Sequence, residues 1–151
     1  MCIFTGDFQI KIDAKGRFVL PSAFLEQAES EGGRTFVIKK DIYEKCLILY
    51  TQSSWRERAE AVKARLNPFN RQHNSFLREF FKDTAEAALD SNNRLLVPKR
   101  LAEEVSLEKD IIVIGLGDKI ELWSEEVFNN SRVSPQEFAA MAQELLGGDL
   151  N

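Results

Sequence analysis

A nine-residue frame that occurs twice is the feature that most constrains the fold of this chain. Residues 13–21 read Asp-Ala-Lys-Gly-Arg-Phe-Val-Leu-Pro, and residues 90–98 read Asp-Ser-Asn-Asn-Arg-Leu-Leu-Val-Pro. Each frame holds an Asp, three turn-type residues, an Arg, three apolar residues and a Pro, and the two frames lie 77 positions apart. Two copies are too few for a solenoid, which needs at least three repeats. The duplication therefore predicts a pair of units that share one core.

The similarity between the copies continues beyond the prolines. The matching segments are 36–38 with 112–114 at an offset of 76, 47–50 with 120–123 at 73, and Trp55 with Phe128 at 73. The falling offset indicates short deletions in loops, which tolerate them. We interpret the chain as two copies of one strand-turn-strand-helix-strand-strand unit.

Hydrophobic periodicity and capping signals predict the individual elements. Ser54 with Glu57 and Ser134 with Glu137 have the spacing of capping boxes, and Pro21 suits the first position of a helix. We expect strands at 9–13, 18–20, 35–39, 46–50, 86–90, 94–97, 111–115 and 119–123, and helices at 22–30, 54–66, 70–82, 99–106, 124–130 and 135–146.

The expected fold class is mainly β with α (α+β). Each copy has four short strands and one helix, too little to bury its own apolar strand faces. We therefore expect two tandem repeats that exchange strands and close one interlocked, barrel-like β core. A helical hairpin separates them and helices follow. The expected boundaries are 1–52 for the first repeat, 53–82 for the hairpin, 83–128 for the second repeat and 129–151 for the C-terminal helix and tail.

The charge is unevenly distributed along the chain. The net charge of −4 argues at first against a nucleic-acid partner. Residues 51–82, however, carry seven basic and three acidic side chains, whereas residues 133–151 carry no basic and three acidic ones. A phosphate backbone meets the local face of a protein and not its total charge. A basic face is therefore compatible with this composition.

Compartment signals favour a cytoplasmic protein with no membrane partner. No signal peptide is visible at the start of the sequence, and the longest apolar run, residues 111–114, is far too short to span a bilayer. Cys2 and Cys46 lack motif spacing, and Cys46 heads an apolar run in which we expect a buried free thiol. Free thiols are typical of a reducing compartment.

Motifs for catalysis are missing from the sequence. The only histidine, His73, lies in a polar segment, where we expect a solvated loop residue. No Cys/His cluster has zinc-ligand spacing, and Gly115-Leu116-Gly117 joins two expected strands instead of opening a helix. We therefore expect no enzyme, no metal, no cofactor and no small-molecule substrate.

The Asp-x-x-x-Arg turn has two compatible interpretations. In the first, the Asp accepts hydrogen bonds from its own turn and pairs with the Arg, which pins the hairpin. In the second, an arginine braced by a carboxylate is pre-organised to fork onto phosphate or guanine. Exposed ion pairs contribute only about 0–1 kcal/mol to stability, which favours a binding role for charge at such a tip. We predict DNA contacts at Lys15, Gly16, Arg17 and Arg94, with Asp13 and Asp90 as braces.

These residues resemble those of the MraZ family of bacterial transcriptional regulators, which is related to AbrB- and MazE-type swapped-hairpin DNA binders. The resemblance covers about residues 3–146. It rests on the two frames, Cys46-Leu47 with Tyr50 and Trp55, and Ile120-Glu121-Leu122-Trp123. It implies two SpoVT-AbrB-like repeats and a homo-oligomeric ring of about eight to twelve copies. It also implies a nucleoid-associated protein that binds double-stranded DNA at tandem short direct repeats upstream of the division and cell-wall gene cluster.

Two alternatives stay open from sequence alone. One is an AbrB-type antitoxin-like module that binds a protein, although such modules usually hold one hairpin unit and a disordered tail. The other is a structural ring without a DNA role. The second frame also departs from the first, because it has Asn92-Asn93 in its turn and no counterpart of Lys15.

Overall fold

The structure is a computed structural model that describes residues 3–31 and 33–147, so Cys2 lies outside it. Within these residues the chain is α+β, as predicted, and none of the helices is long and apolar enough to cross a membrane. In chain order the elements are β1 (Asp7–Lys11), β2 (Arg17–Val19), α1 (Ser22–Ser30), β3 (Thr35–Lys40), β4 (Leu47–Thr51), α2 (Gln52–Ala64), α3 (Arg71–Lys82), β5 (Thr84–Ala88), β6 (Arg94–Leu96), α4 (Lys99–Glu104), β7 (Asp110–Gly115), β8 (Ile120–Ser124), α5 (Glu125–Ser131) and α6 (Pro135–Leu146).

The two copies exchange strands, as the sequence predicts. Six strands form an antiparallel sheet in the order β1-β7-β8-β4-β3-β5, and β2 pairs with β6 in a separate two-stranded ribbon. The first strand of each copy thus pairs with the third strand of the other, β1 with β7 and β5 with β3. The predicted barrel-like closure is not confirmed, because β1 and β5 form the edges of the sheet among the described pairings.

The strand registers show how the copies correspond. Ile10 of β1 is paired with Ile111, and Ala87 of β5 is paired with Phe36. Ile10 and Ala87 lie 77 positions apart, so Phe36 corresponds to Ile111 at an offset of 75. The predicted offset of 76 was wrong by one residue. A one-residue slip matters because it moves every side chain of a strand to the opposite face of the sheet.

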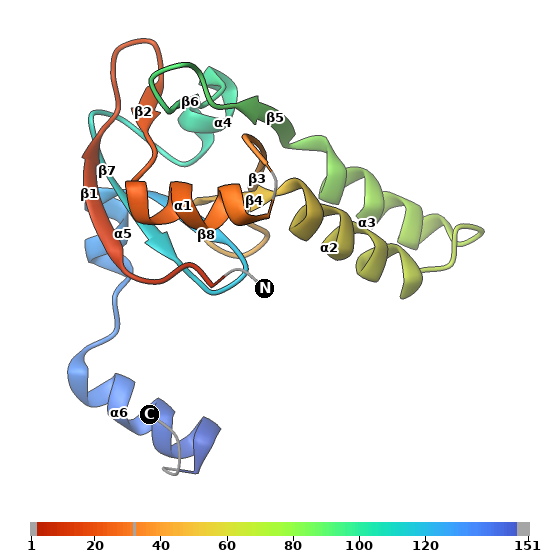
Figure 1. Cartoon of the computed structure of the whole chain (residues 1–151). Helices are drawn as coiled ribbons and strands as arrows, with labels where there is room; N and C mark the ends of the chain where they lie inside the picture. The colour runs from red at the N-terminus through yellow and green to blue at the C-terminus, as the bar shows by residue number, and fades with distance from the viewer. Residues whose placement is uncertain (1–2, 32, 148–151) are drawn as a thin grey trace.

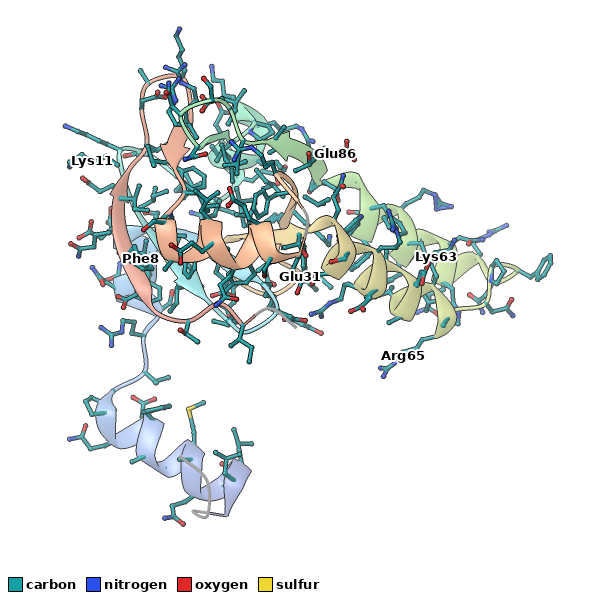
Figure 2. The ribbon with its side chains drawn as sticks, in the orientation of Figure 1. Phe8, Lys11, Glu31, Lys63, Arg65 and Glu86 are labelled. Atoms are coloured by element: carbon teal, nitrogen blue, oxygen red, sulfur yellow. The ribbon has the colours of Figure 1, made fainter. Side chains whose placement is uncertain are left out.

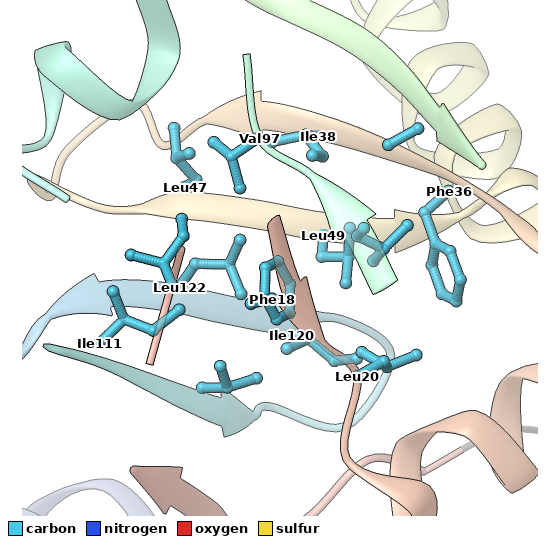
Figure 3. Packing of buried hydrophobic residues seen from close by; sticks show 14 of the residues in the cluster. Phe18, Leu20, Phe36, Ile38, Leu47, Leu49, Val97, Ile111, Ile120 and Leu122 are labelled. Atoms are coloured by element: carbon cyan, nitrogen blue, oxygen red, sulfur yellow. The ribbon is translucent and has the colours of Figure 1, made fainter. Parts of the chain in front are cut away.

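One face of the sheet carries the main core. The ribbon turns Phe18 and Leu95 toward this face, while α1 and α4 add Phe24 and Leu101, and all four side chains are fully buried. Figure 3 shows Phe18, Leu20 and Val97 among the inward side chains of the sheet strands. Each buried side chain of this size contributes about 1.5–3 kcal/mol. The ribbon is therefore fixed to the body by its inner face.

The opposite face of the sheet carries a second, aromatic cluster. Tyr50 contacts Trp55 with ring centroids 5.6 Å apart, and Trp123 contacts Phe128 at the same 5.6 Å. The predicted correspondence of Trp55 with Phe128 is thereby confirmed. Cys46 is fully buried in this cluster as a free thiol, as predicted, and burial raises its pKa.

Helices α2 and α3 form the predicted hairpin, which projects from the body as an arm (Figure 1), with Lys63 and Arg65 on its outer part (Figure 2). Lys39 on β3 is buried under the arm, where its ammonium group donates to the Phe80 carbonyl and lies 4.3 Å from the centroid of the Phe80 ring. Burial lowers the pKa of Lys39. This contact fixes the last turn of α3 to the sheet.

Three local predictions were wrong, two about helix starts and one about the place of His73. Helix α2 begins at Gln52 and not at Ser54, because the Thr51 hydroxyl at the end of β4 already accepts from the Ser54 amide at 3.2 Å. Pro21 is the N-cap residue of α1 and not its first helical residue. His73 lies in the first turn of α3, where its Nδ1 accepts from the Asn67 amide at 2.8 Å and closes the loop of the arm.

Helix α6 stands away from the core, at the end of the molecule opposite the β1–β2 and β5–β6 turns (Figure 1). Ser134 and Glu137 form the predicted capping box, and Gly147 ends the helix in the left-handed conformation. An apolar stripe runs along this helix and is exposed to solvent: Phe138, Met141, Leu145 and Leu146.

Candidate nucleic-acid interface

The first turn is built around the carboxylate of Asp13. Its Oδ1 accepts from the backbone amides of Lys15 and Arg17, both at 2.9 Å, and its Oδ2 accepts from Arg17 Nε at 2.8 Å. The Asp13 amide in turn donates to the Arg17 carbonyl, and the Gly16 amide donates to the Asp13 carbonyl. Asp13 therefore belongs to the turn and not to β1, which ends at Lys11 instead of the predicted residue 13.

The second turn repeats this geometry. Asp90 accepts from the amides of Asn92 at 2.8 Å and Arg94 at 2.9 Å, and its Oδ2 accepts from Arg94 Nε at 2.8 Å. Gly16 has a φ of +90° and Asn93, which takes its place, has a φ of 59°. Asn is among the few residues that tolerate this conformation, which explains how the second copy dispenses with glycine.

Both carboxylates are held in the charged state. The pKa of Asp13 is lowered, chiefly because the Arg17 amide donates to the carboxylate, and the Arg94 amide lowers the pKa of Asp90 in the same way. The Arg17 and Arg94 side chains are 31% and 29% exposed. Each gives only Nε to its Asp, and no hydrogen bond described for residues 3–31 and 33–147 uses their terminal Nη groups. The forked ends of the two braced arginines are thus available to an acceptor.

The ribbon brings the two arginines together on one surface. Arg17 is paired with Leu96, and Arg94 with Val19, in an antiparallel register. Because Phe18 between them points into the core, the alternation of a strand turns Arg17, Val19, Arg94 and Leu96 outward. Val19 and Leu96 are 53% and 52% exposed. We call these four residues the outer face of the ribbon.

Sequence reasoning missed the apolar half of this outer face. It predicted Arg17 and Arg94 but treated Val19 and Leu96 only as strand residues. The period-2 alternation around Phe18 was a usable signal, since a strand with a buried central residue exposes both of its neighbours.

Each turn lies against the start of a helix from the other copy. The Val97 amide, just before α4, donates to the Gly16 carbonyl at 2.8 Å, and the Leu20 amide, just before α1, donates to the Asn93 carbonyl at 3.0 Å. A Cβ on Gly16 would lie 2.9 Å from the Val97 carbonyl oxygen, so this close approach requires glycine. Lys15 is exposed at the tip of the first turn. Both turns lie at the same end of the molecule (Figure 1).

The described part of the chain, residues 3–31 and 33–147, holds no group of three or more His, Cys, Asp or Glu side chains that could bind a metal ion. The candidate interface offers two guanidinium groups, a lysine, two methyl-bearing side chains and backbone groups of the turns.

Comparison with known proteins gives the family. A family model described as "MraZ protein, putative antitoxin-like" matches the chain twice, over residues 3–79 and 80–145, in agreement with a two-copy chain. A protein of Phocaeicola vulgatus named "Transcriptional regulator MraZ" is 34% identical over 148 residues, which are 98% of this chain and 96% of that protein.

Two further relatives carry the same name. The protein of Bacteroides thetaiotaomicron is 34% identical over 99% of this chain and 96% of its own length, and that of Cytophaga hutchinsonii is 35% identical over 97% and 96%. These names are those of transcriptional regulators and not of enzymes, in agreement with the prediction from the sequence. The double match and the near full-length similarity show that this chain belongs to the MraZ family.

Proposed function

We propose that this chain is a sequence-specific, DNA-binding transcriptional regulator whose DNA contact is the outer face of the β2–β6 ribbon with its two flanking turns. One observation carries the proposal: two arginines, each braced by a carboxylate through Nε, lie diagonally on the same outer face of a two-stranded ribbon, and their terminal Nη groups are unused in the described hydrogen bonds. The names of the relatives support the regulatory role.

A two-stranded ribbon has the right shape for this task, because the major groove of B-DNA is about 12 Å wide and admits one. Arginine forks onto the N7 and O6 atoms of guanine, and each such contact discriminates by about 1–3 kcal/mol. Val19 and Leu96 offer methyl groups suited to the C5-methyl of thymine. Lys15 and the amides of the turns would contact phosphates and fix the register without reading sequence.

We further propose that the chain assembles into a closed homo-oligomeric ring of about eight to twelve copies. The exposed apolar stripe of α6 supports this, because no other described part of the same copy covers it. The helical arm of a neighbouring copy is a suitable partner for α6. The arm segment 51–82 has seven basic and three acidic side chains and exposes Phe69, Phe76 and Phe81, whereas α6 carries Glu137 and Glu144 and no base.

A ring explains how a small contact surface could give useful affinity. One protomer brings only a few cations to DNA, but a ring delivers the next ribbon to the next repeat at high effective concentration. Tandem short direct repeats upstream of the division and cell-wall genes are the site that we propose, in the cytoplasm and at the nucleoid. The boundaries 1–52, 53–82, 83–128 and 129–151 remain our proposed division of the chain.

The antitoxin-like alternative fits less well. The chain has two hairpin units that share one core and an ordered helical end, instead of one unit with a disordered tail. A structural ring without a DNA role does not account for the Nη groups of Arg17 and Arg94, which no described hydrogen bond uses.

The test is a fluorescence-anisotropy titration of the whole chain. The probes are duplex DNA from upstream of its own gene and a scrambled duplex of equal length and composition, both with excess non-specific competitor. We expect the upstream probe to bind at least tenfold more tightly, and the preference to disappear in the R17A/R94A variant. The matched control is R132A, because Arg132 is exposed and lies in the link between α5 and α6, outside the ribbon, its turns and the arm. Equal affinity for both probes would overturn the proposal.

A further inference from the structure

The two ends of the ribbon are related by the repeat but differ in charge. Lys15 in the first turn corresponds to Asn92 in the second, and Lys99 at the start of α4 corresponds to Ser22 at the start of α1, both at an offset of 77. Because the copies exchange strands, the start of α4 lies beside the first turn and the start of α1 beside the second. Lys15 and Lys99 therefore lie at the same end of the ribbon.

A third lysine joins them around one cavity. A cavity of about 730 Å³ beneath the first turn is lined by Lys15, Lys99 and Lys109, together with apolar side chains such as Val97 and Leu107. Within residues 3–31 and 33–147, no hydrogen bond or ion pair is described for the side chains of Lys15 and Lys109.

Acidic groups on the same cavity leave these lysines largely uncompensated. The Asp13 carboxylate is committed to the Arg17 amide and Nε. Glu103 lies 3.9 Å from Lys99 in a pair whose side chains are 90% and 68% exposed, which contributes little. Glu108 is the remaining acid at the rim.

The residue equivalent to Lys109 at the other end of the ribbon is Arg34, and its side chain is hydrogen-bonded. The Ile12 amide donates to the Lys109 carbonyl at 2.9 Å, and the Leu89 amide donates to the Arg34 carbonyl at 2.8 Å, so Lys109 and Arg34 occupy equivalent positions. Arg34 Nη2 donates to the Asp90 carbonyl and to Asn93 Oδ1, each at 3.0 Å, and Nη1 pairs with Glu29 at 3.3 Å.

The glycine of the first turn removes one of the acceptors that hold Arg34 in the second turn. The counterpart of Asn93 is Gly16, which has no side-chain oxygen to accept a bond. Arg34 is therefore tied to the second turn, whereas Lys109 is not tied to the first. One end of the ribbon thus carries three exposed lysines. The equivalent positions at the other end are an asparagine, a serine and an arginine that is hydrogen-bonded to its own turn.

We propose that Lys15, Lys99 and Lys109 form one phosphate-contacting cluster, so that each protomer binds DNA in a single orientation. This rests on the proposed function and adds the polarity of the contact. A protein with two equivalent ends reads palindromic half-sites. Here the lysine cluster contacts the DNA backbone on one side of the DNA repeat only. Successive DNA repeats must therefore point in the same direction to be bound by one ring.

The test uses wild-type protein and three forms of one probe: a duplex carrying a single DNase-protected repeat from the upstream DNA, with both flanks, or with either flank trimmed to the repeat. Removing the flank beneath the cluster should lower the affinity, whereas removing the other flank should leave it unchanged. The K99S variant should lose about one unit of salt slope and about fivefold in affinity at 0.15 M salt, as expected for one phosphate contact. K99S should also become less sensitive to which flank is removed.

The matched control moves the lysine to the other end. The K99S/S22K variant keeps the net charge of the chain, and both positions are exposed at helix starts. We expect it to recover affinity for the full duplex but to depend on the opposite flank. If K99S binds all three probes as the wild type does, Lys99 contacts no phosphate. If K99S/S22K behaves as the wild type does toward both trimmed probes, only net charge matters. Either result overturns the inference while the proposed function stands. Failure of the wild type to prefer the upstream DNA over scrambled DNA would overturn the proposed function itself.

Discussion

Arg17 lies directly opposite Leu96 in the β2–β6 ribbon, so the arginine of the first copy and an exposed apolar residue of the second copy are immediate neighbours. In the second such pair the copies exchange roles, since Val19 of the first copy lies opposite Arg94 of the second. The outer face of the ribbon is thus shared by both copies, and neither copy forms it alone. The strand exchange that completes the core also builds the candidate recognition surface.

Loss of either arginine should weaken DNA binding without unfolding the protein. Each guanidinium group adds only an exposed ion pair to the fold, which contributes about 0–1 kcal/mol. We expect R17A and R94A each to lose about 1–3 kcal/mol of DNA-binding free energy per engaged ribbon. R17K should be almost as weak, because lysine keeps the charge but lacks the fork. Anisotropy titrations measure the affinity, and circular dichroism measures the fold. Unfolding of R17A would instead support a purely structural role.

Gly16 should be far less replaceable than another glycine of the same backbone conformation. Gly16 and Gly117 both have positive φ, at +90° and +78°. A Cβ at Gly16 would meet the Val97 carbonyl oxygen at 2.9 Å, whereas nothing lies within 4 Å of one at Gly117. We expect G16A to lower the free energy of unfolding by about 1–3 kcal/mol more than G117A does. Urea denaturation compares the two variants, and equal losses would mean that the close approach costs nothing.

Acid should remove the contribution of Asp13 and Asp90 to the free energy of unfolding. The folded-state pKa values of Asp13 and Asp90 lie below the ordinary 3.8, so the charged carboxylates stabilise the fold at every pH above 3.8. This stabilisation is lost as the pH falls through the lowered values. The difference in unfolding free energy between wild type and the D13N/D90N variant should be constant from pH 7 to about 4 and shrink below that. Denaturant unfolding at several pH values measures it. A difference that widens in acid would contradict the bracing role.

Charge on the apolar stripe of α6 should disrupt the assembly and leave the protomer folded. Phe138 and Leu145 are 67% and 72% exposed and lie outside both core clusters. We therefore expect F138E/L145E to retain its unfolding transition but to lose oligomer mass in light scattering. The matched control is Q136E/Q143E, which adds the same charge to α6 at polar positions. If both variants keep the mass of the wild type, α6 does not hold the ring together.

Much of the fold could be predicted from local signals, because the duplicated frame indicates both the shared core and the exchange of strands. The correspondence of β3 with β7 could not. A run such as Ile111 to Ile114 is apolar at every position, since both faces of the sheet are covered, and it contains no alternation to fix the register. The strand pairings of the structure show that Phe36 corresponds to Ile111.

The braces of the candidate site could be predicted, but the difference between its two ends could not. The Asp-x-x-x-Arg spacing alone implies an Asp that accepts bonds from its own turn. The position of Arg34 depends on a contact with Asn93, 59 residues away, which no local pattern records. Similarly, the cap of α2 is Thr51 and not the expected Ser54, because α2 begins directly where β4 ends.

The most direct test of the account is a titration against salt on probes with one, two and three upstream repeats, in which one repeat is also moved by half a helical turn, about 5 bp. Neutralising Z phosphates gives a slope of about −0.9Z in log K against log salt. We predict that each added in-phase repeat steepens the slope and raises the affinity, because its ribbon is already delivered by the ring. A displaced repeat should contribute nothing. Equal affinity and equal slope for all probes would contradict the claim that the ribbons act together on DNA.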